Sequence, residues 1–149
     1  MNEVLGDPTR SADTSRPVSV VVDVANVMGS RPDGWWRDRA AAALRLVSEL
    51  ASFAGSVVEG PDGGPIVLTR LLTVVEGRAR GIPEVPGAEV VRAEGDGDDT
   101  VLAACLRCRA EGERVLVVTA DRGLRARLPD GAGVAGPRWL LGLLGPSRP

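Results

Sequence analysis

The sequence predicts an α/β protein with a mainly parallel sheet of four to five strands and helices on both faces. Three observations lead to this fold class. Short valine-rich runs alternate with stretches whose apolar residues recur at helical spacing, as in a chain of successive β-α units. The first run, residues 17–24, is almost continuously apolar, as expected of a strand covered on both sides. Acidic residues stand where the predicted strands end.

The first half of the chain predicts two strands and one long helix. After the first strand, residues 29–34 form a loop, and a helix then extends to about residue 53. Trp36, Ala43 and Leu50 fall on one apolar stripe of that helix. The elements that follow are a glycine-rich connection at 55–65 and a second strand at 66–75.

The second half repeats the alternation in shorter elements. Asp98 or Asp99 is expected to cap a helix that extends to about residue 110. A proline at the first position is typical of the start of the closing helix. The predicted elements are a strand at 88–92, the helix from 98 or 99, a strand at 114–119, a short helix at 121–128, a strand stub at 134–135 and a helix at 137–144.

Size and composition indicate one globular domain. With 149 residues, 44% hydrophobic and 26% charged, the chain is long enough to bury a core. We expect the domain over 17–145, a disordered tail at 1–16 and a C-terminal tail at 146–149. No apolar run approaches the length of a membrane span, and the opening stretch lacks the apolar core of a signal peptide. A cytoplasmic location without a membrane partner is therefore expected.

The composition also excludes several kinds of chemistry. There is no histidine, and all 18 basic residues are arginines. Histidine-dependent nucleophilic triads, histidine-ligated zinc, Walker loops and Schiff bases are therefore excluded. The two cysteines, Cys105 and Cys108, lie inside a predicted helix without a second pair, so we expect buried structural thiols.

Carboxylates recur at one predicted edge of the sheet. Asp23, Glu76 and Asp121 end the first, second and fourth strands, and Asp98 and Asp99 open the helix after the third. Ligands of open α/β sheets bind beyond the carboxyl ends of the strands. Several carboxylates directed at one place need a compensating cation, so this pattern predicts a divalent metal site. Taken singly, some of these acids have a simpler interpretation as helix caps or solvated residues.

The ordered set of motifs resembles the PIN-like nucleases, and within them the NYN group. The resemblance spans about residues 18–144 and comprises Asp23-Val24-Ala25-Asn26, Glu76-Gly77, the run from Asp99 to Ala104, and Thr119-Ala120-Asp121. It implies a three-layer α/β/α sandwich that binds Mg²⁺ or Mn²⁺ and cleaves RNA phosphodiesters. Asp23, Asp99 and Asp121 would hold the metal, with Asp98 and Glu76 secondary and the choice between Asp98 and Asp99 open. Asn26 and Thr119 would orient the carboxylates or hold a phosphate oxygen.

Arginines and a tryptophan near the strand ends are candidate nucleic-acid contacts. Guanidinium groups pair with phosphates, and an exposed indole can stack on an unpaired base. The candidates are Arg31, Trp35, Arg37, Arg78, Arg80, Arg122 and Arg125. Trp36 is expected in the core instead.

The predicted function is metal-dependent hydrolysis of single-stranded or structured RNA. The main alternative is a catalytically weak or inactive nucleic-acid-binding or scaffold domain of the same fold. A haloacid-dehalogenase-like or Toprim-like phosphoryl enzyme is less favoured, because the first strand lacks a second Asp and the chain has no Lys. The sequence leaves open a homodimer, the number of metal ions, and endonuclease against exonuclease action.

Overall fold

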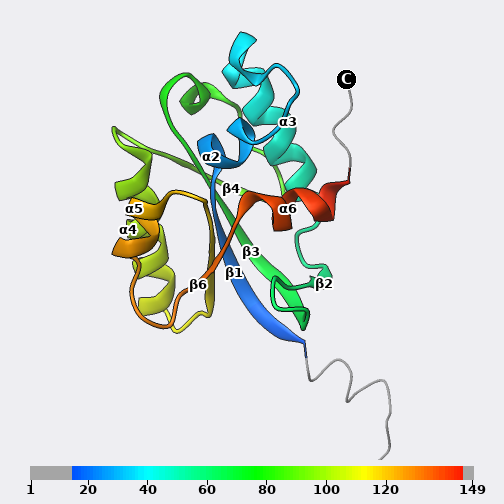
Figure 1. The fold of residues 1–149 in the computed structure, drawn as a ribbon, viewed down its shortest axis with the longest axis vertical. Helices are drawn as coiled ribbons and strands as arrows, with labels where there is room; N and C mark the ends of the chain where they lie inside the picture. The colour runs from blue at the N-terminus through cyan, green and yellow to red at the C-terminus, as the bar shows by residue number, and fades with distance from the viewer. Residues whose placement is uncertain (1–14, 146–149) are drawn as a thin grey trace, which may run out of the picture.

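Six strands form one sheet in the computed structural model, which describes residues 15–145 (Figure 1). The strands are β1 (Arg16–Asp23), β2 (Val57–Glu59), β3 (Pro65–Val75), β4 (Glu89–Arg92), β5 (Val115–Val118) and β6 (Gly133–Ala135). Their order is β2-β3-β1-β5-β6, and β4 also pairs with β3. Four pairings are parallel and the β2–β3 pairing is antiparallel. The sheet is therefore mixed, with parallel strands at its centre.

The antiparallel strand β2 corrects the prediction of four to five strands. It lies in the segment that the sequence suggested was only a glycine-rich connection. Val57 and Val58 pair with the start of β3, and the Gly60 amide donates to the Gly64 carbonyl at 2.7 Å to close the turn between them. Gly63 has a positive φ of 93°, a conformation that glycine adopts without steric cost. A three-residue strand is too short to produce a periodic signal.

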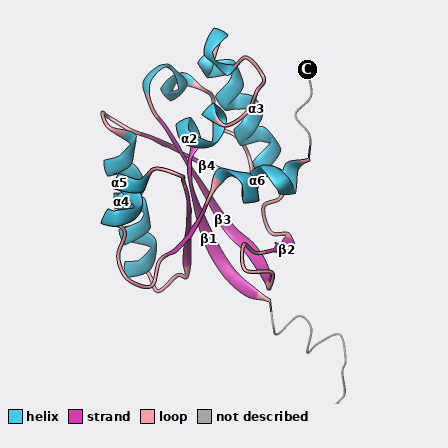
Figure 2. Cartoon of the chain, in the orientation of Figure 1, coloured by secondary structure: helices cyan, strands magenta, loops and turns pink. Residues whose placement is uncertain are grey.

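Helices cover both faces of the sheet, as expected for an α/β protein (Figures 1 and 2). The α-helices are α2 (Val24–Gly29), α3 (Arg39–Ala51), α4 (Gly97–Ala110), α5 (Arg122–Arg127) and α6 (Pro137–Leu144). Two 3₁₀ turns, η1 (Trp35–Arg37) and η2 (Gly77–Gly81), complete the set. Alternate residues of β1 enter two separate cores: Val20 and Val22 join the α3 side, whereas Val21 joins the α4 side. This explains why β1 is apolar along almost its whole length.

The region between β1 and α3 differs most from the prediction. An additional short helix, α2, begins directly after Asp23, and α3 begins only at Arg39. Trp36 therefore lies in η1, outside the helical stripe, and is 57% exposed. The expectation that Trp36 belongs to the core is wrong. Trp35 instead is partly buried and packs against the core.

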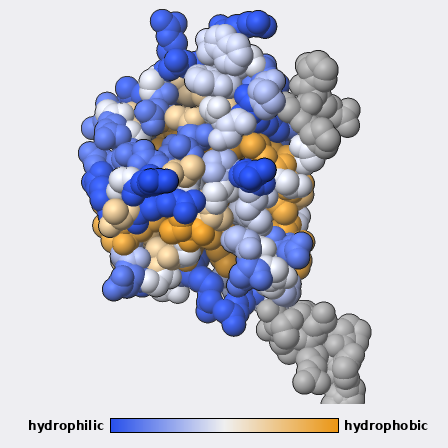
Figure 3. All heavy atoms as spheres, viewed as in Figure 1, coloured by the Kyte–Doolittle hydropathy of each residue, from blue (hydrophilic) through white to orange (hydrophobic). Residues whose placement is uncertain are grey.

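The expectation for the two cysteines is confirmed. Cys105 and Cys108 are buried free thiols on the inner side of α4. No helix within residues 15–145 is long and apolar enough to cross a membrane. β1 begins at Arg16, one residue before the predicted domain start. Residues 1–14 of the predicted N-terminal tail and the predicted C-terminal tail at 146–149 lie outside the described residues. Hydrophobic surface is visible over α6 (Figure 3), whose outer leucines are only partly buried.

The register brings the carboxyl ends of the central strands to one edge. Asp23 pairs with Val74 of β3, Val22 with Val118 of β5, and Val75 with Arg92 of β4. Because these pairings are parallel, the segments that follow all four strands begin at the same edge. These segments carry most of the predicted site residues.

Candidate active site at the carboxyl ends of the strands

Asp23 is the buried carboxylate of this edge. It ends β1 and is only 6% exposed. Its Oδ1 accepts from the Asn26 amide at 3.3 Å, and its Oδ2 accepts from the Thr119 hydroxyl at 2.9 Å. The first contact makes Asp23 the N-cap of α2. The sequence indicated no capping role for Asp23, because α2 itself was not predicted.

Thr119 and Asn26 connect the ends of β1 and β5. The buried Thr119 hydroxyl accepts from the Asp121 amide at 3.1 Å while it donates to Asp23. The Asn26 Oδ1 accepts from the Ala120 amide at 2.8 Å. These three contacts fix the backbone after β5 relative to α2, so the Asp23 and Asp121 side chains are set in a defined relation.

Asp121 caps the helix that follows β5. Its Oδ1 accepts from the Leu124 amide at 2.9 Å, which satisfies one of the free amides in the first turn of α5. Its side chain is half-buried. The capping interpretation and the metal-ligand interpretation are compatible, because no described side chain hydrogen-bonds to the other carboxylate oxygen.

The acidic turn before α4 is arranged differently from the prediction. Asp96 is the N-cap, and its Oδ1 accepts from the Asp98 amide at 2.9 Å. The expectation that Asp98 or Asp99 caps the helix is wrong. Asp98 is half-buried, whereas the Asp99 carboxylate is 68% exposed and pairs with Arg127 at 2.7 Å. Asp98 therefore faces the other carboxylates more directly than Asp99.

Glu76 lies against the start of α4. A Cβ atom added at Gly97 would overlap with the Glu76 carboxylate, so this close approach requires a glycine at the first residue of the helix. The sequence contains the signal for it, since Gly97 stands within a Gly-Asp-Gly run, but its partner could not be identified without the fold. The contact brings the end of β3 next to Asp96 and Asp98.

Burial and, after it, mutual repulsion raise the pKa values of the carboxyls at this edge. Burial raises the pKa of the Asp23 carboxyl, and the charges of Asp121 and Asp96 raise it further, although hydrogen bonds from Thr119 and Asn26 oppose the rise. Burial likewise raises the pKa of Glu76, with added repulsion from Asp23, Asp96 and Asp98. The edge thus concentrates negative charge. Among the described residues, Arg127 is the cation that opposes it.

Asp98 shows the same pattern and ties it to α5. Burial raises the pKa of its carboxyl first, followed by the charges of Asp121, Asp96 and Asp23, while Arg127 lowers it. Asp23, Asp98 and Asp121 are therefore close enough to repel one another across three strand ends. A bound cation would relieve that repulsion.

The side chains fit a divalent ion that retains much of its water. As placed, residues 15–145 contain no group of three or more His, Cys, Asp or Glu side chains that could together hold an ion. Mg²⁺ needs no such group, because it binds through one or two carboxylates and keeps several waters. The oxygen donors and the raised pKa values of Asp23 and Asp98 match that chemistry.

The predicted nucleic-acid contacts separate into surface and structural residues. Arg31 is 5% exposed and pairs with Glu49 of α3 at 2.7 Å, so it is a structural ion pair and not a surface contact, which corrects the prediction. Arg125 donates from Nε to the Thr119 carbonyl at 2.8 Å and so supports the site. The remaining candidate arginines, all exposed, are Arg37, Arg78, Arg80 and Arg122.

Comparison with known proteins shows the fold of this chain. No family model and no curated protein matches its sequence. Among solved structures, it is similar to Rae1 (YacP) from Bacillus subtilis, in a point-mutant form, with a TM-score of 0.62 and 17% sequence identity. The similarity covers 86% of this chain and 74% of that chain. At this identity, the likeness shows a shared α/β fold.

Proposed function

We propose that the protein is a metal-dependent ribonuclease with a PIN-like, three-layer α/β/α fold. The observation that carries the proposal is the buried Asp23 carboxylate. It is 6% exposed, and burial, followed by one another's charge, raises the pKa values of the Asp23, Glu76 and Asp98 carboxyls. Carboxylates that are buried and repel one another lower the stability of the folded protein. A functional role explains why they are retained better than a structural role does. The resemblance of the same residues to PIN-like nucleases gives the reaction class.

In this proposal Asp23, Asp98 and Asp121 hold Mg²⁺ or Mn²⁺, one or two of them directly and the remainder through its water ligands, and Asp99 and Glu76 add negative charge around it. A bound ion of this kind lowers the pKa of a water ligand and stabilises charge on the phosphate and the leaving oxygen. Thr119 and Asn26 keep the first and last of the three carboxylates in register through the hydrogen bonds described above.

The exposed arginines supply the contacts to RNA. Arg122 at the start of α5, Arg78 and Arg80 in η2, and Arg37 in η1 surround the acidic edge on elements that follow β5, β3 and β1. Guanidinium groups bind phosphates bidentately. They would offset the repulsion between the carboxylates and the RNA backbone, so affinity should fall steeply with salt.

A catalytically inactive RNA-binding domain of the same fold is the second candidate. One observation favours it, namely that no three carboxylates of the described chain already converge on a point that could hold an ion. Under this alternative the arginines still bind RNA, but divalent metal neither changes the stability of the protein nor starts RNA cleavage.

The experiment that separates the two candidates compares metals on one RNA. In Ca²⁺, which fills oxygen sites but supports such chemistry poorly, labelled single-stranded RNA should bind and remain intact, and exchange into Mn²⁺ should start cleavage. Asp23→Asn should lower the cleavage rate at least about a hundredfold. Arg122→Ala should mainly weaken binding. Arg107→Ala is the matched control, because it changes an exposed arginine in the last turn of α4, at the opposite end of that helix from the acidic edge. Binding in Mn²⁺ with every RNA and DNA substrate left intact would support the scaffold instead.

A further inference from the structure

A small pocket opens beside the acidic edge, between α2, η1 and η2. Its volume is about 160 Å³, below the roughly 300–1,000 Å³ of sites for drug-sized ligands. The pocket is lined by Val24, Ala25, Met28, Trp35, Arg39, Glu76, Arg78 and Ala79. It therefore has room for one flat ring system and not for a whole nucleotide.

The lining combines an aromatic wall with three charged side chains, namely Arg39, Arg78 and Glu76. Trp35 is partly buried and held in place by the core, and the Arg39 guanidinium lies 5.3 Å from the centroid of its ring. Bases of single-stranded RNA stack on both aromatic rings and guanidinium planes. Met28, Ala25 and Ala79 add an apolar wall.

Glu76 connects the pocket to the candidate active site. Its side chain lines the pocket and also lies against Gly97, next to Asp96 and Asp98. A base in the pocket would thus belong to a nucleotide adjacent to the phosphate at the acidic edge. The shared wall places the two sites next to each other.

We propose that this pocket is a nucleobase subsite that holds the base next to the scissile phosphate and selects guanine. The inference rests on the proposed function, since it takes RNA as the substrate. Arg78 offers paired donors for the adjacent O6 and N7 acceptors of guanine, the commonest specific pairing of arginine with a base. Glu76 accepts from the N–H groups on the other side of the same base. Adenine and uracil have no two adjacent acceptors for Arg78, and cytosine, whose O2 and N3 are adjacent acceptors, offers Glu76 one amino group where guanine offers both N1–H and N2–H.

The test measures binding of the four ribonucleoside monophosphates by titration calorimetry, without cleavage as a readout. GMP, AMP, CMP and UMP carry the same phosphate, so differences between them report the base. GMP should bind at least about fivefold more tightly than the others. Trp35→Leu should weaken GMP binding about 5- to 150-fold, the loss expected for one base–aromatic stack. Arg78→Gln should remove most of the preference for GMP over AMP.

Matched controls and a second Trp35 variant keep the test falsifiable. Trp36→Phe and Arg107→Gln change an exposed tryptophan and an exposed arginine outside the pocket, and both should bind GMP as the unchanged protein does. If Trp35→Leu proves unstable in thermal melts, Trp35→Phe takes its place in the test. Because it keeps an aromatic ring, it should retain most of the affinity for GMP. Equal affinities for all four monophosphates, or unchanged GMP binding in Arg78→Gln, would overturn the subsite.

The subsite and the nuclease can fail separately. RNA cleaved in Mn²⁺ with no preference for a neighbouring guanine, together with no GMP binding, would overturn the subsite and leave the ribonuclease in place. Selective GMP binding that depends on Trp35 and Arg78, with no RNA cleaved, would support the subsite and overturn the proposed reaction.

Discussion

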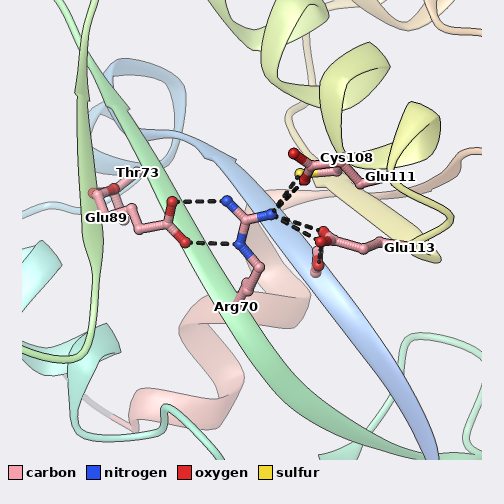
Figure 4. Close-up of polar contacts among 7 residues, drawn as sticks. Arg70, Thr73, Glu89, Cys108, Glu111 and Glu113 are labelled. Atoms are coloured by element: carbon pink, nitrogen blue, oxygen red, sulfur yellow. Dashed lines mark hydrogen bonds and ion pairs between the residues drawn. The ribbon is translucent and has the colours of Figure 1, made fainter.

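The two ends of α4 hold two carboxylate clusters with opposite electrostatics. Helix α4 has 14 residues, so its ends are roughly 20 Å apart. At its C-terminal end, Arg70 of β3 pairs with Glu89 at 2.8 Å, Glu113 at 2.9 Å and Glu111 at 3.1 Å (Figure 4). At its N-terminal end, Asp96 and Asp98 meet Asp23, Glu76 and Asp121, and the described chain supplies no comparable central cation.

The pKa values of the two clusters differ accordingly. The Arg70 guanidinium lowers the pKa of Glu89, and the Ser19 hydroxyl, followed by Arg70, lowers that of Glu113. Burial and neighbouring carboxylates raise the pKa values of Asp23, Glu76 and Asp98. The first cluster contains its cation and stabilises the fold, whereas the second is suited to take one up. The same residue type therefore has two roles, which only the surroundings distinguish.

The largest expected effect concerns the two adjacent aspartates of α4. If the N-terminal cluster holds the metal, Asp98→Asn should lower Mn²⁺-dependent cleavage about a hundredfold or more, since even residues that only support a metal ligand cost 10- to 100-fold. Asp99→Asn should change it less than about threefold, because that carboxylate is exposed and paired with Arg127. Initial rates on one labelled RNA measure both. A larger loss in Asp99→Asn would restore Asp99 as the ligand that the sequence favoured.

Asp98 and Asp99 also show how much of the candidate site could be predicted from the sequence. The valine runs and the acidic strand ends predicted the α/β fold and the edge at which the carboxylates gather, because burial on both faces and strand polarity leave direct traces in the sequence. Asp98 and Asp99 have the same chemistry and differ by about 100° around the helix. The start of α4 sets their directions, and it depends on the Asp96 cap and on the contact between Glu76 and Gly97. Such contacts between distant segments leave no local pattern.

The prediction for the region around η1 was wrong for a similar reason. Trp35 and Trp36 are neighbours of equal hydrophobicity, and helical periodicity extended backwards from α3 placed Trp36 in the core. The Asp38 side chain accepts from the Ala41 amide at 3.0 Å and caps α3, which stops the helix two residues after Trp36. The cap signal was present in the sequence, and the periodic pattern obscured it.

Metal binding should stabilise one cluster and leave the other unchanged. Mg²⁺ at a hundredfold excess over its dissociation constant should raise the free energy of unfolding by about 2.7 kcal/mol, seen as an increase in melting temperature. Asp121→Asn should abolish the increase while the apo protein stays as stable or becomes more stable, since Asn caps helices as well as Asp and repulsion is removed. A large loss of apo stability would show that Asp121 is mainly structural.

Removing the cation of the other cluster should destabilise the protein without affecting the reaction per folded molecule. Arg70→Met should lower the free energy of unfolding by about 1–2 kcal/mol, between the values for exposed and buried ion pairs, because the Arg70 side chain is 29% exposed. Glu84→Gln removes the ion pair of Arg92 with a carboxylate that is 77% exposed and should cost less than about 0.5 kcal/mol. Urea titrations of both variants provide the comparison.

The smallest expected effect is the pH dependence of the metal-free protein, and it has opposite signs in the two clusters. The folded pKa of Asp98 lies above its ordinary 3.8, so between these values the folded state binds more protons than the unfolded state. Stability contributed by Asp98 is therefore present at low pH and lost as pH rises through the raised pKa. The folded pKa of Glu89 lies below its ordinary 4.5, so its contribution is present above 4.5 and lost on acidification.

Asp98→Asn should accordingly be more stable than the unchanged protein at pH 7, by less than about 1 kcal/mol, with the advantage shrinking as pH falls toward 4. Glu89→Gln should be less stable at pH 7, and its deficit should shrink as pH falls below 4.5. Melting curves in chelator between pH 4 and 7 measure both, and curves of the same sign for the two variants would contradict the contrast between the clusters.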